Sequence, residues 1–123
     1  MQSFMEIERK FLIDSFPTGL LMRVEFRITK EHFYALAEMV TQPFITKDFR
    51  IYQLPGGLEL ECSLVDKGCD TEFMYAEVEF PSVQAAENFE PLPCFTADVT
   101  KDSSYKMKNF WKRTRLSTGM AAL

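Results

Sequence analysis

This chain is poor in the residues on which several common kinds of site depend. It has one histidine, His32, and three cysteines at irregular spacing, with no C-x-x-C pair. A disulfide framework and a structural zinc site are therefore both disfavoured, and we expect reduced cysteines in a cytoplasmic protein. A Ser-His-Asp or Cys-His mechanism has only that histidine to draw on, and no local motif supports one.

Long apolar stretches are missing as well. The uncharged segments are short and broken by proline and polar residues, so neither a signal peptide nor a membrane span is predicted. At 123 residues, with 46% hydrophobic residues and 12 phenylalanines, the chain is long enough for one domain with a real core. We expect this domain to span residues 1–116 and residues 117–123 to form a frayed tail.

Basic residues are scarce over most of the chain. Residues 1–100 hold 17 of the 18 acids and 8 of the 14 bases, whereas residues 101–115 hold 6 bases and one acid. The basic end is interpreted either as a contact for phosphate, nucleic acid or a membrane surface, or as a terminal helix whose cations suit its C-terminal dipole. The second interpretation is favoured, because one short basic segment beside an acidic body is weak evidence for a polyanion. We expect no nucleic-acid partner and no membrane partner.

The chain has instead an unusual number of glutamates at alternate positions. Three segments show this alternation and a fourth is a charged variant of it: Glu6-Ile7-Glu8-Arg9-Lys10, Glu59-Leu60-Glu61, Glu77-Val78-Glu79 and Arg23-Val24-Glu25-Phe26-Arg27. In a β-strand, alternate residues point to the same face. The pattern predicts one surface lined by Glu6, Glu8, Glu25, Glu59, Glu61, Glu77 and Glu79. The opposite surface would be lined by apolar neighbours that include Met22, Val24, Phe26, Leu58, Leu60, Ala76, Val78 and Phe80.

Two interpretations of this acidic surface stay open. An antiparallel sheet with one solvated face also alternates apolar and polar residues. Glutamate, however, is a poor strand former, and like charges opposite each other across a sheet are destabilising, so crowded glutamates need a counter-charge. Divalent cations held by oxygen ligands would supply one. Basic side chains would supply another, and the candidates are Lys10, Arg23, Arg27 and Lys47.

The order of the predicted elements indicates an α+β fold. Strands are expected over residues 3–14, 20–28, 44–54, 58–65 and 72–80, with turns at Pro55-Gly56-Gly57 and Asp66-Lys67-Gly68. Helices are expected from Thr29 to before Pro43, after Ser82, and from about 100–102 to Arg115. We therefore predict a mostly antiparallel sheet with about three helices over its apolar face.

The ordered set of motifs resembles the CYTH family, which comprises class IV adenylyl cyclases and thiamine triphosphatases and is also called the triphosphate tunnel metalloenzymes. The opening Glu6-Ile7-Glu8-Arg9-Lys10 is similar to the family's E-x-E-x-K segment, and Arg23-Val24-Glu25 to its R-x-E strand. Glu59-Leu60-Glu61, Glu77-Val78-Glu79 and the segment from Asp98 to Tyr105 resemble later motifs in family order. The resemblance implies a reduced or incomplete antiparallel barrel that forms a tunnel.

The same resemblance implies a site inside that tunnel. Mg²⁺ or Mn²⁺ would be bound by Glu6, Glu8, Glu61, Glu77 and Glu79. The triphosphate would be contacted by Lys10, Arg23, Arg27 and Lys47, and the catalytic candidates are Glu8 and Lys10. Metal ions would neutralise phosphate oxygens, while lysine and arginine would stabilise charge on the leaving group.

Several departures from the family pattern concern the cationic half of this site. The R-x-R and T-x-K strands that usually precede R-x-E are absent, because Phe16-Pro17-Thr18-Gly19 runs directly into Leu20. Phe49 and Ser104 stand where arginines are common, and Arg27 replaces a glutamate. Arg50 is one residue away from the expected position, which turns its side chain to the other face. The loss of two strands also leaves sheet edges exposed. Closure in a smaller barrel is one remedy, and a homodimer that pairs these edges or shares a tunnel is another; we expect the homodimer.

Three functions follow as hypotheses. The first is a CYTH-like protein that binds a divalent metal and a phosphorylated small anion in an acidic tunnel, with weak or absent triphosphate hydrolysis. The second is an active metal-dependent triphosphatase that acts on tripolyphosphate or on a nucleoside or thiamine triphosphate. Cyclase activity ranks lower, because no adenine or ribose pocket is indicated. The third is a catalytically silent dimeric interaction module, in which the acidic face contacts the basic C-terminal helix.

Overall fold

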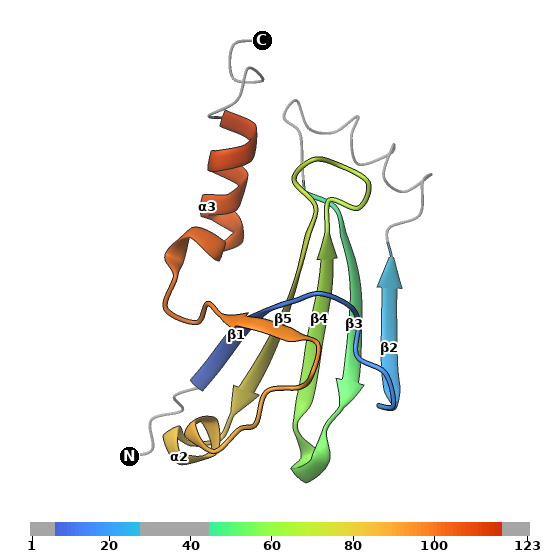
Figure 1. The fold of residues 1–123 in the computed structure, drawn as a ribbon, viewed down its shortest axis with the longest axis vertical. Coiled ribbons are helices and arrows are strands. Elements are labelled where there is room, and N and C mark those ends of the chain that lie inside the picture. The colour runs from blue at the N-terminus through green and yellow to red at the C-terminus, as the bar shows by residue number, and fades with distance from the viewer. Residues whose placement is uncertain (1–6, 28–44, 117–123) are drawn as a thin grey trace.

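The fold is built around one antiparallel sheet of six strands. The computed structural model describes residues 7–27 and 45–116, without the side chains of Phe26, Arg27 and Leu116. The strands are β1 (Ile7–Ile13), β2 (Met22–Arg27), β3 (Lys47–Gln53), β4 (Glu59–Val65), β5 (Phe73–Phe80) and β6 (Phe95–Asp98). Their order in the sheet is β2-β3-β4-β5-β1-β6, so within the described residues the sheet is open, with β2 and β6 at its edges (Figure 1).

Two short α-helices accompany the sheet in the described residues, α2 (Val83–Glu87) and α3 (Met107–Trp111), and α3 continues as a π-helical turn, η3 (Lys112–Leu116). Two single 3₁₀ turns, η1 (Pro55–Gly57) and η2 (Ser103–Tyr105), complete the described elements. The third predicted helix, from Thr29 to before Pro43, and the predicted tail at residues 117–123 lie outside the described residues.

The cap of α2 is confirmed, whereas the start of the last helix is corrected. Ser82 caps α2 by accepting a hydrogen bond from the backbone N–H of Ala85 at 3.0 Å. The last helix begins at Met107 and not at 100–102. The reason is local, because Asp102 caps the separate η2 turn by accepting from the N–H of Ser104, and Lys106 then has extended backbone angles.

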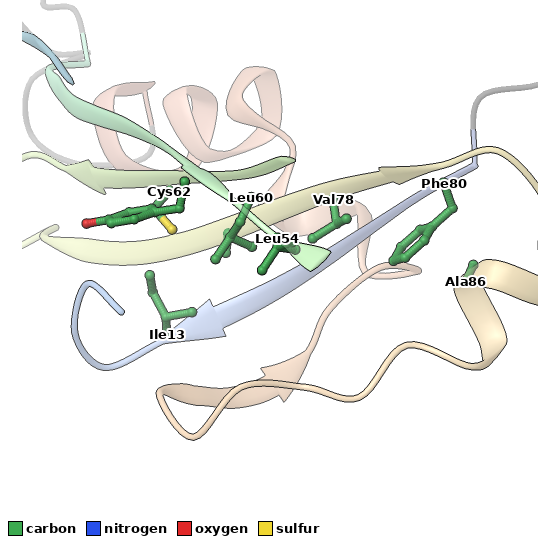
Figure 2. Packing of buried hydrophobic residues seen from close by; sticks show 9 residues of the cluster. Ile13, Leu54, Leu60, Cys62, Val78, Phe80 and Ala86 are labelled. Carbon is green, nitrogen blue, oxygen red and sulfur yellow. The ribbon is translucent and has the colours of Figure 1, made fainter. Parts of the chain in front are cut away.

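One side of the sheet carries the main hydrophobic core. Its buried members come from β1, β3, β4, β5 and α2 and from Leu54, which directly follows β3. They are Ile13, Tyr52, Leu54, Leu60, Cys62, Ala76, Val78, Phe80 and Ala86. Figure 2 shows the labelled side chains gathered on this side, with Ala86 of α2 beside Phe80. Leu60, Cys62, Ala76 and Val78 are completely buried, as the alternation along β4 and β5 predicts.

A smaller core lies on the opposite side of the sheet. Val65, Tyr75 and Phe110 are buried together, and Leu12, Ile45, Phe73 and Met107 pack against them. Phe110 belongs to α3, and its ring centroid lies 4.9 Å from that of Phe73. The prediction that all helices cover the main apolar face is therefore wrong for α3, which covers one end of the glutamate-bearing face. Sequence periodicity shows that a helix has an apolar stripe but not which side of a sheet the stripe meets.

The described part of the chain contains no helix that is both long enough and apolar enough to cross a membrane. All three cysteines are free, Cys62 is buried and Cys69 is exposed.

Candidate functional site

Strand register brings four of the predicted glutamates together on one face of the sheet. Glu8 of β1 stands opposite Glu79 of β5, and Glu77 of β5 stands opposite both Lys10 of β1 and Glu61 of β4. Opposed residues of antiparallel strands point to the same side of the sheet. We call this surface the glutamate face, and its acidic members are Glu8, Glu59, Glu61, Glu77 and Glu79. Glu6 was also predicted here, but it lies outside the described residues.

Glu25 and Val24 do not lie where the simple alternation places them. Glu25 stands opposite Arg50, on the side that carries the main core, and the two side chains form an ion pair at 3.5 Å. Val24 stands opposite Ile51, which in turn stands opposite Glu61, so Val24 is on the glutamate face. Phe26 stands opposite Phe49 in the backbone register, and its side chain, predicted on the apolar surface, lies outside the described part.

The cause is a register shift between Met22 and Val24, which indicates a β-bulge. A bulge inserts one extra residue and reverses the alternation beyond it. The prediction of seven carboxylates on one surface is therefore wrong for Glu25, which lies on the other side of the sheet.

Glu8 and Glu77 form the centre of the glutamate face. Their side chains share a hydrogen bond, which raises the pKa of Glu8 to about 7, and burial together with repulsion by Glu77 and Glu79 acts in the same direction. Two carboxylates can share a hydrogen bond only if one of them carries a proton. Burial also raises the pKa of Glu61, with smaller contributions from the charges of Glu77 and Glu79. The carboxyl groups in this part of the face therefore lie too close together for all of them to be fully ionised at once.

Lys10 and Lys47 lie at the other end of the same face, around Tyr75. The Lys47 Nζ donates to the Tyr75 hydroxyl at 2.6 Å. The Lys10 Nζ donates to the backbone oxygen of Tyr105 at 2.8 Å and lies 4.5 Å from the centroid of the Tyr75 ring. Burial lowers the pKa of Lys10, although the negative charges of Glu77 and Glu8 act in the opposite direction. Cations therefore gather next to the carboxylates, in an arrangement that suits an anion.

The two arginine candidates have different positions. The Arg23 Nη1 lies 2.6 Å from the Glu59 Oε2, so this guanidinium belongs to the glutamate face. Arg27 stands opposite Asp48 in the register, a backbone position on the same side as Glu25, and its side chain is outside the described part.

The family departures at Phe49 and Arg50 have clear structural outcomes. Phe49 stands opposite Ser63 on the glutamate face, so an apolar ring occupies a position where a cation was expected. Arg50 lies on the core side, as the one-residue offset predicts, and its guanidinium carbon sits 3.9 Å from the centroid of the Phe16 ring. Ser104 donates its hydroxyl to Asp102 at 2.6 Å.

Two elements of the site were missed by the sequence reasoning. Tyr75 organises both lysines, and its spacing of two residues from Glu77 places it on the same face, so the alternation contained this signal. The backbone oxygen of Tyr105 carries no side-chain signal, because it reaches Lys10 only through the turn at η2.

As a metal site, the glutamate face offers hard oxygen donors, which suit Mg²⁺ and Mn²⁺. Within residues 7–27 and 45–116, no group of three or more histidine, cysteine or acidic side chains is placed so that it could hold a metal ion. The donor type therefore fits, whereas the described residues alone do not form a complete set of ligands.

Comparison with known proteins agrees with this geometry. No family model matches the chain, and no curated protein matches it. Among solved structures, the chain is similar to the crystal structure of the inorganic triphosphatase NE1496, with 27% sequence identity and a TM-score of 0.66 over 89% of this chain and 96% of that chain. A crystal structure described as that of the hypothetical protein NE1496 is 28% identical, with a TM-score of 0.64 over 86% and 96%.

The resemblance to the CYTH family is confirmed. The fold of this CYTH-like chain matches that of a triphosphatase over most of its length, with the glutamate face formed by β1, β4 and β5. The tunnel expected for the family is not closed in the described residues, since their sheet ends at β2 and β6. Phe49, which stands on the glutamate face at a position where an arginine is common, departs from the family pattern set out above.

Proposed function

We propose that this CYTH-like chain binds a triphosphate anion together with a divalent cation on its glutamate face, and hydrolyses it weakly or not at all. The observation that carries the proposal is the register that places Glu77 of β5 between Lys10 of β1 and Glu61 of β4, with Glu8 two residues from Lys10 on β1. A bound cation and a polyphosphate need ligands of both signs on one surface, and this register supplies them.

The cation would be held by Glu8 and Glu77, with Glu61 and Glu79 beside them. It would replace the proton that Glu8 and Glu77 share and would relieve the repulsion that raises the pKa of Glu8. When bound, such an ion neutralises phosphate oxygens and orients the anion.

The phosphates would be contacted by Lys10 and Lys47, with Arg23 at the β2 side of the face. All three cations already have protein partners, namely the Tyr105 carbonyl, the Tyr75 hydroxyl and the Glu59 carboxylate. A phosphate oxygen is a better partner for a cation than a neutral oxygen, so Lys10 and Lys47 can exchange partners at moderate cost.

Weak hydrolysis follows from the small number of these cations. Charge that develops on the leaving phosphate must be stabilised by groups fixed in advance. Here Phe49 occupies a position on the face where a cation was expected, and Arg50 points to the core side. Binding is therefore retained more fully than turnover.

The second candidate function is an active inorganic triphosphatase. The observation that favours it is the similarity to NE1496, a solved structure described as an inorganic triphosphatase. In this case Glu8 and Lys10 would be catalytic, and phosphate release with Mg²⁺ or Mn²⁺ would be rapid.

One paired experiment tests both candidates. Thermal unfolding is measured with tripolyphosphate, with Mn²⁺ and with both, and phosphate release is measured on the same samples. Binding at a ligand concentration 100 times Kd stabilises a protein by about 2.7 kcal/mol, which gives a clear thermal shift. We expect a shift with both ligands that Glu8→Gln and Lys10→Met abolish.

The matched control is Lys67→Met, which removes a lysine from the exposed turn between β4 and β5. It should leave the shift unchanged. A shift with little phosphate release supports the proposal, and fast release that Glu8→Gln abolishes supports the second candidate. If no combination of ligands shifts the unfolding temperature, both functions are wrong.

A further inference from the structure

Lys10 stands directly opposite a carboxylate on the sheet and yet forms no ion pair with it. Glu77 is its partner in the register of β1 and β5, and the Cβ atoms of residues opposed in this way lie about 5 Å apart. Glu25 and Arg50 are opposed in the same manner and do form an ion pair, at 3.5 Å. In the part of the chain that the structure describes, no carboxylate forms an ion pair with Lys10.

The Lys10 ammonium is held instead by two uncharged partners. Its Nζ donates to the backbone oxygen of Tyr105 in η2 at 2.8 Å and lies 4.5 Å from the centroid of the Tyr75 ring. A carbonyl oxygen and an aromatic face both stabilise an ammonium without neutralising its charge. Glu77 meanwhile shares a hydrogen bond with Glu8. The cation and the carboxylates therefore stay separate although they are neighbours.

The position of the Tyr105 carbonyl is fixed by hydrogen bonds in and around η2. The Asp102 carboxylate accepts from the backbone N–H of Ser104 at 3.0 Å and from its hydroxyl at 2.6 Å. The side chain of Asn109, in α3, donates to the backbone oxygen of Ser103 at 2.7 Å. A side chain that satisfies the backbone of a turn stabilises that turn. The acceptor of Lys10 is thus anchored both by its own cap and by the following helix.

The backbone of Lys10 is held by the same segment of the chain. The Val99 N–H donates to the Lys10 carbonyl at 2.9 Å, and the Lys10 N–H donates to the Thr100 hydroxyl at 3.0 Å. Residues 99–105 therefore contact the backbone N–H, the backbone carbonyl and the side-chain ammonium of this one lysine. Its strand position and its side-chain position depend on a single element.

We propose that Asp102 is a positioning residue that acts through η2. By fixing this turn it keeps the Lys10 ammonium on the Tyr105 carbonyl and out of an ion pair with Glu77. A carboxylate is a stronger partner for an ammonium than a neutral carbonyl, so an anion that must displace Glu77 would bind Lys10 less tightly. The benefit for anion binding rests on the proposed function, whereas the separation of the two side chains is a property of the chain without ligand.

A double-mutant cycle between Lys10→Met and Glu77→Gln tests this separation and needs no ligand. Urea denaturation gives the equilibrium constant of unfolding for each variant. We expect a coupling of less than about twofold in this constant for the unaltered chain, and of about fivefold in an Asp102→Ala background, where a partly exposed ion pair can form. Asp102→Asn keeps an oxygen that can cap the turn, so it should restore the small coupling.

The matched control is Ser82→Ala, which removes the cap of α2 and leaves that of η2 intact. It should leave the coupling small. Asn109→Ala loosens η2 from the side of α3 and should raise the coupling even if Asp102→Ala does not fold. A coupling that is the same in every background, or that is already about fivefold in the unaltered chain, would overturn the inference.

Titration with tripolyphosphate in the absence of divalent cations tests the consequence for binding. Asp102→Ala should weaken binding about fivefold when Glu77 is present, and should have no effect once Glu77→Gln has removed the competing carboxylate. Equal weakening in both backgrounds would mean that η2 only supports the fold. Tighter binding would mean that the Tyr105 carbonyl merely competes with the anion. Either result would overturn the inference.

The two experiments separate the inference from the function on which its benefit rests. If the unaltered chain binds no tripolyphosphate with or without Mn²⁺, the proposed function is wrong. The double-mutant cycle still decides whether Asp102 keeps Lys10 apart from Glu77.

Discussion

At the scale of single residues, the most consequential feature is a pair of carboxylates that share a proton. Glu8 and Glu77 come from neighbouring strands, and their hydrogen bond holds the pKa of Glu8 near 7, well above its ordinary value of 4.5. A carboxylate pair in this state is sensitive both to pH and to any cation that can take the place of the proton.

This pair predicts the pH dependence of stability. Between pH 4.5 and about 7 the folded chain binds a proton that the unfolded chain has lost, so the free energy of unfolding should fall as the pH rises through this window. We expect the unfolding temperature to drop between pH 5 and pH 8, and Glu8→Gln to flatten that drop because its amide can donate to Glu77 at every pH.

Glu87→Gln is the control, since Glu87 is exposed on α2, and it should leave the slope unchanged. Saturating Mn²⁺ should raise the unfolding temperature more at pH 8 than at pH 5. An unfolding temperature that is the same from pH 5 to pH 8 in the unaltered chain would show that the two side chains do not share a proton.

At the scale of elements, one buried ion pair connects η3 to the turn between β4 and β5. Arg115 follows α3, and its two Nη atoms donate to both carboxylate oxygens of Asp66 at 2.7 and 2.8 Å. Asp66 is 1% exposed and also accepts from the Thr71 hydroxyl at 2.7 Å. The pair joins the turn between β4 and β5 to the helical segment that covers one end of the glutamate face. Figure 1 shows this turn and the C-terminal end of that segment in the same part of the molecule.

Removal of this charge should destabilise the whole domain. Asp66 has a positive φ of 53°, and asparagine tolerates this conformation, so Asp66→Asn tests the charge and not the backbone. Loss of one member of a buried pair costs about 3 kcal/mol or more, and we expect that loss in urea denaturation. Asp70→Asn, in the same turn but exposed, should change the free energy of unfolding by less than about 0.5 kcal/mol.

The sign of the pH effect is opposite to that of Glu8. Arg115 and Thr71 hold the pKa of Asp66 below its usual range against the effect of burial. The stabilisation is therefore present above pH 3.8 and is lost as the pH falls through the folded-state pKa. Asp66→Asn with the same midpoint as Asp70→Asn would contradict this role.

Elements also show how far sequence alone predicts this molecule. Alternation placed Glu8, Lys10, Glu61 and Glu77 correctly, because a strand without a bulge fixes the side of every residue. It failed at Glu25, where a single extra residue reverses the alternation. The position of α3 could not be predicted either, since Phe110 and Met107 indicate an apolar stripe but contain no information about which face of the sheet it meets.

At the scale of the whole molecule, Cys62 reports on the integrity of the core. It is completely buried on β4, and burial raises the pKa of its thiol to about 12. The thiolate is the nucleophile that attacks an alkylating reagent, so Cys62 should react only when the sheet opens, whereas the exposed Cys69 should react at once.

Peptide-resolved mass spectrometry after pulses of alkylating reagent can follow both sites across a urea series. We expect the labelling of Cys62 to rise together with global unfolding measured by circular dichroism, and the labelling of Cys69 to stay constant. Equal labelling of the two thiols without urea would mean that β4 is accessible in the native fold and that the core described above is wrong.

The strand order also constrains how the chain reaches its fold during synthesis. Strands β2 to β5 follow one another in the sheet as they do along the chain, whereas β1 lies between β5 and β6, the last strands in the chain order. The ribosome therefore releases the β1 segment first, although its partners are made last. The β1 segment, with its glutamates and lysine, therefore has no partner strand until most of the polypeptide has been synthesised. Closure of the loop between distant strands is slow, so the β1 part of the candidate site should be the last part of the newly synthesised protein to fold.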